Sequence, residues 1–140
     1  MTEIFDILDS PDSPVSRGQF AIQLKHNGNN CCQAVLLAFA NEVNLSEEQL
    51  RQMGAAFGGG MGCMEGTCGA LCAAEMLLGL KQFQGRPVLG TARQIHQDFT
   101  QKSGASICKD LKGIETGTVL CSCDDCVRNA VESAEKYIFN

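Results

Sequence analysis

Apolar positions along the chain recur at helical spacing, and no stretch alternates apolar and polar residues for long enough to form a strand. The two most apolar segments are "CCQAVLLAFANEV", which starts near Asn30, and "CGALCAAEMLLGL", which follows Thr67. Both are apolar on most faces, so we expect them to form a central helix pair. Their small and apolar residues should allow close approach: Ala34, Val35, Ala38, Ala70, Ala73 and Ala74. The pattern predicts a compact all-α bundle of about five to seven helices.

More polar segments supply the remaining helices of this bundle. Ser46 with Gln49 fits a capping box at the start of "SEEQLRQM". Thr67 and Ser106 are expected to cap the helices that follow them. The other expected helices cover Thr2–Leu8, Val15–His26, Val88–Lys102, the short segment "ICKDL" and Asp124–Tyr137.

Length and charge limit the protein classes that remain. With 140 residues, the chain is expected to form one domain over residues 1–140, with residues 1–14 as a peripheral segment. The net charge of −5 and the lack of a basic run argue against nucleic acid as a partner. The N-terminus lacks the order of a signal peptide, and no apolar run approaches the ~20 residues of a membrane span. We therefore expect a cytoplasmic protein that does not bind membranes.

The unusual feature of the composition is its cysteine content. There are nine: Cys31, Cys32, Cys63, Cys68, Cys72, Cys108, Cys121, Cys123 and Cys126. An odd number of thiols in a chain without an export signal is more typical of metal, cluster or redox chemistry than of a disulfide framework. Individual cysteines can still be simple core residues.

Several of these thiols fall where helices are expected to begin. Cys31, Cys68 and Cys108 each lie in a first turn, and "CSCDDC" (residues 121–126) spans the start of the last helix. Unpaired N–H groups and the helix dipole favour a negative charge at such positions. We therefore expect a lowered pKa at Cys68. If the helix starts converge, their thiolates would suit an iron–sulfur cluster.

A glycine-rich segment, "FGGGMG" (residues 57–62), precedes the most apolar helix. Without Cβ atoms, Gly59 and Gly60 could direct backbone N–H groups toward a cluster, a sulfide or a similar anion. The alternative is that the glycines only permit a tight entry into a crowded helix pair. A nucleotide loop is excluded, because no Gly-Lys-Ser/Thr sequence and no preceding strand are present.

The segments "NCCQAVLLAF", "FGGGMG", "TCGALCAAEMLLGL", "CKDLKG" and "CDDCVRNAVESAEKY" together resemble the C_GCAxxG_C_C family of redox-active proteins. The resemblance covers about residues 18–138 and is most specific over Phe57–Leu80. It implies that the four family cysteines are Cys31, Cys68, Cys108 and either Cys123 or Cys126, with Cys123 favoured.

The chain departs from the family pattern at two positions. The core motif of the family is Cys-Gly-Ala-x-x-Gly, and its last glycine is Ala73 here. Glu75 stands where an apolar residue is usual. A lone buried carboxylate is costly, so Glu75 should have a partner or reach the surface.

Two further groups of side chains lie outside this four-cysteine set. Cys72, four residues after Cys68, could join it as a ligand or pack against the helix that starts near Asn30, which we favour. His26 and His96 show no ligand spacing and are expected at the surface.

Three functions fit these residues. The first is an iron–sulfur cluster held for electron transfer, with Cys31, Cys68, Cys108 and Cys123 as metal ligands and redox residues, and with Cys126, Gly59 and Gly60 lining the site. The second is thiol/disulfide redox chemistry without a cofactor, for which Cys123 and Cys126 offer a close pair. The third is structural zinc, which is less favoured because the thiols come singly from separate helices. Each redox function requires a partner protein, and the sequence leaves open a homodimer and whether the protein is an enzyme.

Overall fold

The computed structural model describes residues 15–140, and in this part of the chain the fold is all-α, as predicted. Eight α-helices and one short 3₁₀ helix occur here, so the expectation of about five to seven helices was too low. The expected helix over Thr2–Leu8 lies outside the described residues. The elements are α2 (Arg17–His26), α3 (Cys31–Ala38), η1 (Ala40–Glu42), α4 (Glu47–Gly54), α5 (Gly58–Met61), α6 (Gly69–Gln82), α7 (Leu89–Ser103), α8 (Cys108–Lys112) and α9 (Cys123–Tyr137).

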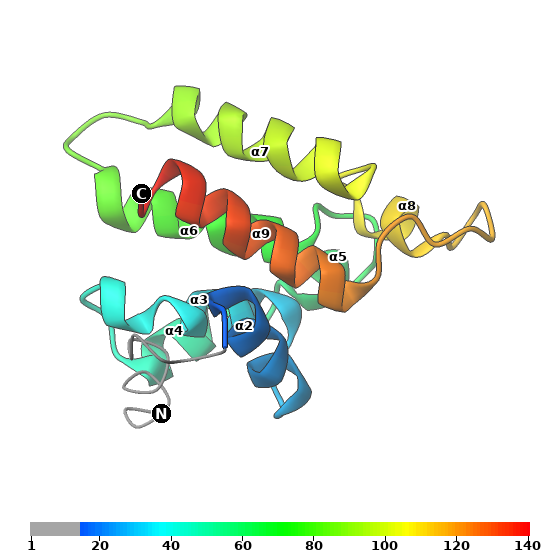
Figure 1. Cartoon of the computed structure of the whole chain (residues 1–140), viewed down its shortest axis with the longest axis horizontal. Coiled ribbons are helices and arrows are strands. Elements are labelled where there is room, and N and C mark those ends of the chain that lie inside the picture. The colour runs from blue at the N-terminus through cyan, green and yellow to red at the C-terminus, as the bar shows by residue number, and fades with distance from the viewer. Residues whose placement is uncertain (1–14) are drawn as a thin grey trace.

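The central helix pair is the predicted one. Within residues 15–140, α3 and α6 pack against each other more extensively than any other two elements. The predicted small and apolar residues of the two helices are all fully buried: Ala34, Val35, Ala38, Ala70, Ala73 and Ala74. Figure 1 shows α9 crossing the middle of the molecule, with α7 on one side and α2 and α3 on the other. The core therefore lies between α3, α6 and α9.

Side-chain caps begin several of these helices. Asn30 and Gln33 form a capping box at the start of α3, and Ser46 and Gln49 form the predicted one at the start of α4. Ser122 accepts a hydrogen bond from the backbone N–H of Asp125 at the start of α9. These caps satisfy N–H groups that would otherwise lack partners.

The predicted caps Thr67 and Ser106 were wrong. Helix α6 begins one residue after Cys68, and neither α6 nor α8 has a side-chain cap. Thr67 instead pairs with Ile107 in an isolated antiparallel β-bridge. Across this bridge the Cys68 N–H donates to the Ser106 carbonyl at 2.8 Å. The bridge therefore fixes the starts of α6 and α8 side by side.

No helix in the described part of the chain is both long and apolar enough to cross a membrane.

Candidate functional site

Four cysteines stand at helix starts, as predicted. Cys31, Cys108 and Cys123 are the first residues of α3, α8 and α9, and Cys68 immediately precedes α6. The β-bridge between Thr67 and Ile107 holds the Cys68 and Cys108 starts together. Helix α5 contacts α3, α6 and α8, so this turn lies among three of these starts. In Figure 1, α5, α8 and the first turn of α9 lie at the same end of the molecule.

The sulfur atoms gather in one place. The Cys68 side chain lies within interaction range of the Cys31 and Cys126 side chains. Cys108 lies within electrostatic reach of both Cys31 and Cys123. We call these five residues the thiol cluster. Its members range from Cys126, which is fully buried, to Cys123, which is exposed.

The glycine-rich turn lies against this cluster. Gly59 donates its backbone N–H to the Cys31 sulfur, as does Cys32 within the first turn of α3. A Cβ atom at Gly60 would lie 2.5 Å from the Cβ of Cys108, and one at Gly69 would lie 2.7 Å from the Cys31 Sγ. The glycines therefore make room for the thiols as well as supplying an N–H donor.

The same turn has a left-handed backbone. The φ angles of Gly59, Gly60 and Met61 are 63°, 60° and 63°, and Gly62 follows at 81°. Glycine adopts this conformation at little cost, whereas Met61 does not. The left-handed run reverses the chain before α6 and presents the Gly59 N–H to Cys31.

The prediction of a lowered pKa at Cys68 was wrong. The hydrogen bond with Cys126 and burial raise the pKa of Cys68 to about 12, although contacts with Cys31 and with the backbone N–H of Ala70 act in the opposite direction. The helix start is present, but neighbouring thiols and desolvation outweigh it.

Cys31 follows the same pattern. Its hydrogen bond with Cys68 and its burial raise its pKa, and the N–H groups of Gly59 and Cys32 only partly offset this. Burial likewise raises the pKa of Cys108, although Lys112 opposes the change. In the metal-free protein at neutral pH, Cys31, Cys68 and Cys108 are therefore neutral thiols.

Sequence analysis missed one member of the site, Lys112. Its Nζ lies 3.5 Å from the Cys126 Sγ and donates to the Cys121 carbonyl at 3.1 Å. It also contacts the Cys123 side chain. Burial acts to lower the pKa of Lys112, but the negative charge that Cys126, Cys123 and Cys68 carry when ionised outweighs burial and raises the pKa. Its sequence context, "CKDLKG", shows only a lysine in a short polar segment.

The other four cysteines border the cluster, and Cys121 shares its contacts, because the Cys126 thiol and Lys112 both donate to the Cys121 carbonyl. Cys32 is buried in the core, and its burial raises its pKa. Cys72 is partly buried, directs its thiol to the Thr67 carbonyl at 3.8 Å, and has a pKa raised by burial to about 11. Cys121 accepts a contact from the Asn129 amide at 3.7 Å, and Cys63 is exposed.

Three other polar side chains considered in the sequence lie outside the cluster. His26 and His96 are exposed, as predicted, and His26 pairs with Asp124 at 2.8 Å. Glu75 is partly buried, and its burial raises its pKa although His96 acts to lower it. Glu75 thus reaches the surface in part, which was one of its two expected outcomes.

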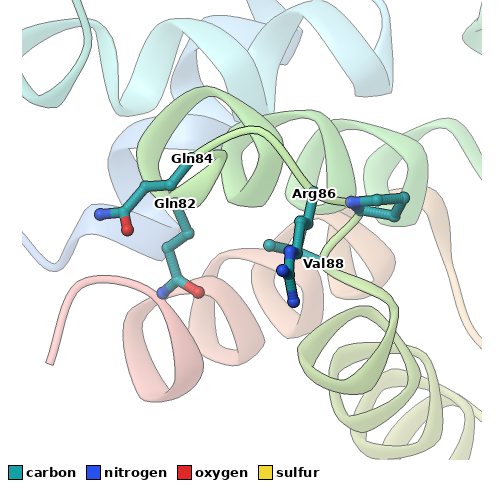
Figure 2. Close-up of a pocket in the computed structure, with 5 residues that line it drawn as sticks. Gln82, Gln84, Arg86 and Val88 are labelled. Atoms are coloured by element: carbon teal, nitrogen blue, oxygen red, sulfur yellow. The ribbon is translucent and has the colours of Figure 1, made fainter.

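Among the residues that the structure describes, no group of three or more Cys, His, Asp or Glu side chains is arranged to hold a single metal ion. A surface pocket in the described part of the chain lies apart from the cysteines. This pocket of about 360 Å³ lies at the turn between α6 and α7 and contains no cysteine. In Figure 2, the side chains of Gln82 and Arg86 extend on the same side of this turn.

Comparison with known proteins gives one result. The family profile described as "Putative redox-active protein (C_GCAxxG_C_C)" matches residues 29–137, which include all five members of the thiol cluster. No curated protein and no solved structure matches the chain significantly. The matched region extends from the start of α3 to the end of α9 and so contains the whole site and most of the core. The chain therefore belongs to the C_GCAxxG_C_C family of putative redox-active proteins.

Proposed function

We propose that the thiol cluster holds an iron–sulfur cluster and transfers electrons to and from a partner protein. The observation that carries this proposal is the gathering of Cys31, Cys68 and Cys126, with Cys108 and Cys123 beside them, at the starts of four helices. Iron–sulfur clusters are held by cysteine thiolates, so an all-sulfur donor set of this size suits them. Zinc is less favoured, because its structural sites usually draw ligands from paired Cys-x-x-Cys segments, and only α9 contains one.

The surroundings of the sulfurs also suit an anionic, sulfur-rich group. Backbone N–H groups of Gly59 and Ala70 point to the Cys31 and Cys68 sulfurs. Gly60 and Gly69 keep Cβ atoms away from Cys108 and Cys31. Such N–H donors stabilise thiolate sulfur and tune the potential of a bound cluster.

The raised pKa values of these thiols count against nucleophilic attack in the metal-free protein. The raised pKa of Cys31 and of Cys68 makes both thiols poor nucleophiles at neutral pH. Metal binding displaces such protons and converts the thiols to thiolates. A bound cluster would supply a one-electron redox couple, while the protein's own residues hold the sulfurs, donate N–H groups and keep water from the buried side.

Loading with iron and sulfide tests this proposal. The protein is purified without oxygen, supplied with ferrous iron and sulfide, and analysed for iron, sulfide and zinc together with its visible absorption. We expect bound iron and sulfide in the wild type and in Cys63→Ser, and a loss of most of both in Cys68→Ser. Cys63 is the matched control because it is an exposed thiol outside the cluster. Wild-type protein that binds neither iron nor sulfide would rule the proposal out.

Thiol/disulfide exchange is a second candidate, favoured by a specific observation. The Cys68 side chain interacts with those of both Cys31 and Cys126, so both are candidate disulfide partners of Cys68. A small-molecule disulfide would be the oxidant: two protein thiols form one protein disulfide, and the reagent leaves as two thiols.

Peptide mapping of the metal-free protein tests the second candidate. If the protein exchanges thiols and disulfides, incubation with oxidised glutathione should produce a Cys31–Cys68 or Cys68–Cys126 disulfide. This disulfide should form and reverse as the ratio of oxidised to reduced glutathione is changed. Glutathione attached only to the exposed thiols Cys63 and Cys123 would count against it.

A further inference from the structure

Lys112 places a cation beside the thiol cluster. It is the last residue of α8, it is partly buried, and its Nζ lies 3.5 Å from the Cys126 Sγ. Its other contacts are the Cys121 carbonyl at 3.1 Å and the Cys123 side chain. The ammonium group therefore reaches the two α9 thiols, one of them buried and one exposed.

The charge of Lys112 has no carboxylate partner within residues 15–140. Its contacts there are a carbonyl and cysteine sulfurs, and no Asp or Glu lies within ion-pair distance. Lys109, three residues earlier on the same helix, instead pairs with Glu115 at 3.2 Å. A partly buried cation is costly unless an opposite charge compensates it. The groups that can provide that charge are the α9 thiols when they are deprotonated.

We propose that Lys112 is a positioning residue that supplies the countercharge for the thiolates of Cys126 and Cys123 when the site is in use. The inference rests on the proposed function, since these thiols become thiolates when they hold a cluster. A positive charge beside a cluster ligand stabilises the more negative, reduced state and so raises the reduction potential. Lys112 thus sets the potential of the site without holding the cluster itself.

Three variants, each compared with the wild type, separate a charge effect from a structural one. Lys112→Gln keeps an N–H donor but removes the charge, and Lys112→Arg keeps the charge. Lys109→Gln is the matched control, because it removes a lysine charge from an exposed ion pair on the same helix. Thermal unfolding followed by circular dichroism checks that each variant folds. If Lys112→Gln does not fold, Lys112→Arg still tests whether a positive charge at this position is enough to keep the wild-type potential.

The first measurement is the midpoint potential of the iron- and sulfide-loaded protein, followed by its visible absorption. Loss of the Lys112 charge should raise the ratio of oxidised to reduced protein about tenfold at a fixed applied potential. This change corresponds to a fall of 59 mV in the midpoint potential of a one-electron couple. Lys112→Arg and Lys109→Gln should keep the wild-type potential. An unchanged potential in Lys112→Gln, or an equal fall in Lys109→Gln, would overturn the proposal.

The second measurement does not require the cluster. In metal-free protein at pH 8, iodoacetamide alkylates the two exposed thiols, Cys123 and Cys63, and mass spectrometry gives the ratio of their rates. Lys112→Gln should lower this ratio, because the Lys112 ammonium lies against the start of α9, at the Cys121 carbonyl and the Cys126 sulfur, and a nearby positive charge stabilises developing thiolate charge. An unchanged ratio would overturn the role of Lys112. If the wild type binds no iron or sulfide, the proposed iron–sulfur function fails. The ratio of the Cys123 and Cys63 alkylation rates then decides by itself whether Lys112 provides the countercharge.

Discussion

At the scale of single residues, the thiol cluster depends on glycines as much as on cysteines. Gly69 stands where a Cβ atom would lie 2.6 Å from the Phe57 carbonyl oxygen and 2.7 Å from the Cys31 Sγ. The Phe57 carbonyl oxygen is a backbone atom and cannot rotate away from an added Cβ atom. The lack of a side chain at Gly69 is therefore needed for the turn at Phe57 as well as for the Cys31 thiol. In this chain, the glycine of the family motif Cys-Gly-Ala is therefore required because a larger side chain at position 69 would clash with its neighbours.

Replacing Gly69 with alanine tests this steric account. We expect Gly69→Ala to lower the free energy of unfolding by about 1–3 kcal/mol through overpacking. Gly79→Ala, on the same helix, is the control: nothing lies within 4 Å of its Cβ position, so it should be neutral or stabilising by about 0.5–1 kcal/mol. Urea unfolding followed by circular dichroism gives both values. Equal effects at the two positions would refute the account.

The two α9 thiols are predicted to differ in importance. Cys126 is fully buried and contacts Cys68, whereas Cys123 is exposed. We therefore expect Cys126→Ser to lose most of the bound iron and Cys123→Ser to lose less. Iron analysis after identical loading measures this difference. A greater loss in Cys123→Ser would instead assign the fourth family position to Cys123, which the sequence resemblance favours.

At the scale of elements, the sequence predicts where most helices begin but not what holds their starts together. Apolar periodicity and the Ser46–Gln49 capping box are local signals, and both were confirmed. Thr67 and Ser106 were expected to cap helices, but a β-bridge between distant residues determines their conformation. The left-handed α5 turn has no apolar period from which it could be predicted.

A polar contact between helices α7 and α9 should make the stability of the protein depend on pH. The Ser133 hydroxyl donates to Asp98 at 2.6 Å, and Lys102 lies 3.2 Å from the same carboxylate. Burial alone would raise the pKa of Asp98, but these hydrogen bonds and the charges of Lys102 and Lys136 lower it.

Because the pKa of Asp98 is lowered in the folded state, its contribution to stability is present above the ordinary value of about 3.9 and disappears as the pH falls below it. We expect Asp98→Asn to be less stable than the wild type at pH 7, with the difference shrinking below about pH 4. Thermal unfolding across pH measures it, with Glu48→Gln on the exposed side of α4 as the control. A difference that stays constant to pH 3 would contradict this assignment.

At the scale of the whole molecule, folding gathers thiols that the sequence spreads over nearly a hundred positions. The resemblance to the family identified Cys31, Cys68 and Cys108, and helix periodicity placed them at helix starts. The contact of Cys68 with Cys126 and the approach of Lys112 depend on how α8 and α9 pack, which no local pattern reveals. For the same reason, the sequence could not predict that crowded thiols would raise the pKa of Cys68.

The raised thiol pKa values predict an alkaline limit for the metal-free protein. Cys68 and Cys72 have folded-state pKa values of about 12 and about 11, above the ordinary 8.5 or so. The unfolded chain therefore loses protons first, and stability is full below about pH 8.5 and falls as the pH rises above it. Urea unfolding from pH 7 to 10.5 should show this fall, and a smaller one in Cys72→Ala. Constant stability across this range would show that these thiols are not desolvated.

The most direct test of the central claim, that these thiols form one redox centre, is a crystal structure of protein purified and crystallised without oxygen, with diffraction measured at the iron absorption edge. The account predicts one anomalous density, with iron about 2.3 Å from the sulfurs of Cys31, Cys68 and Cys126 and a further ligand from Cys108 or Cys123. A disulfide between two of these residues would support the second candidate. Sulfurs of Cys31, Cys68 and Cys108 more than about 12 Å apart, too far to share one cluster, would contradict the claim of a single centre.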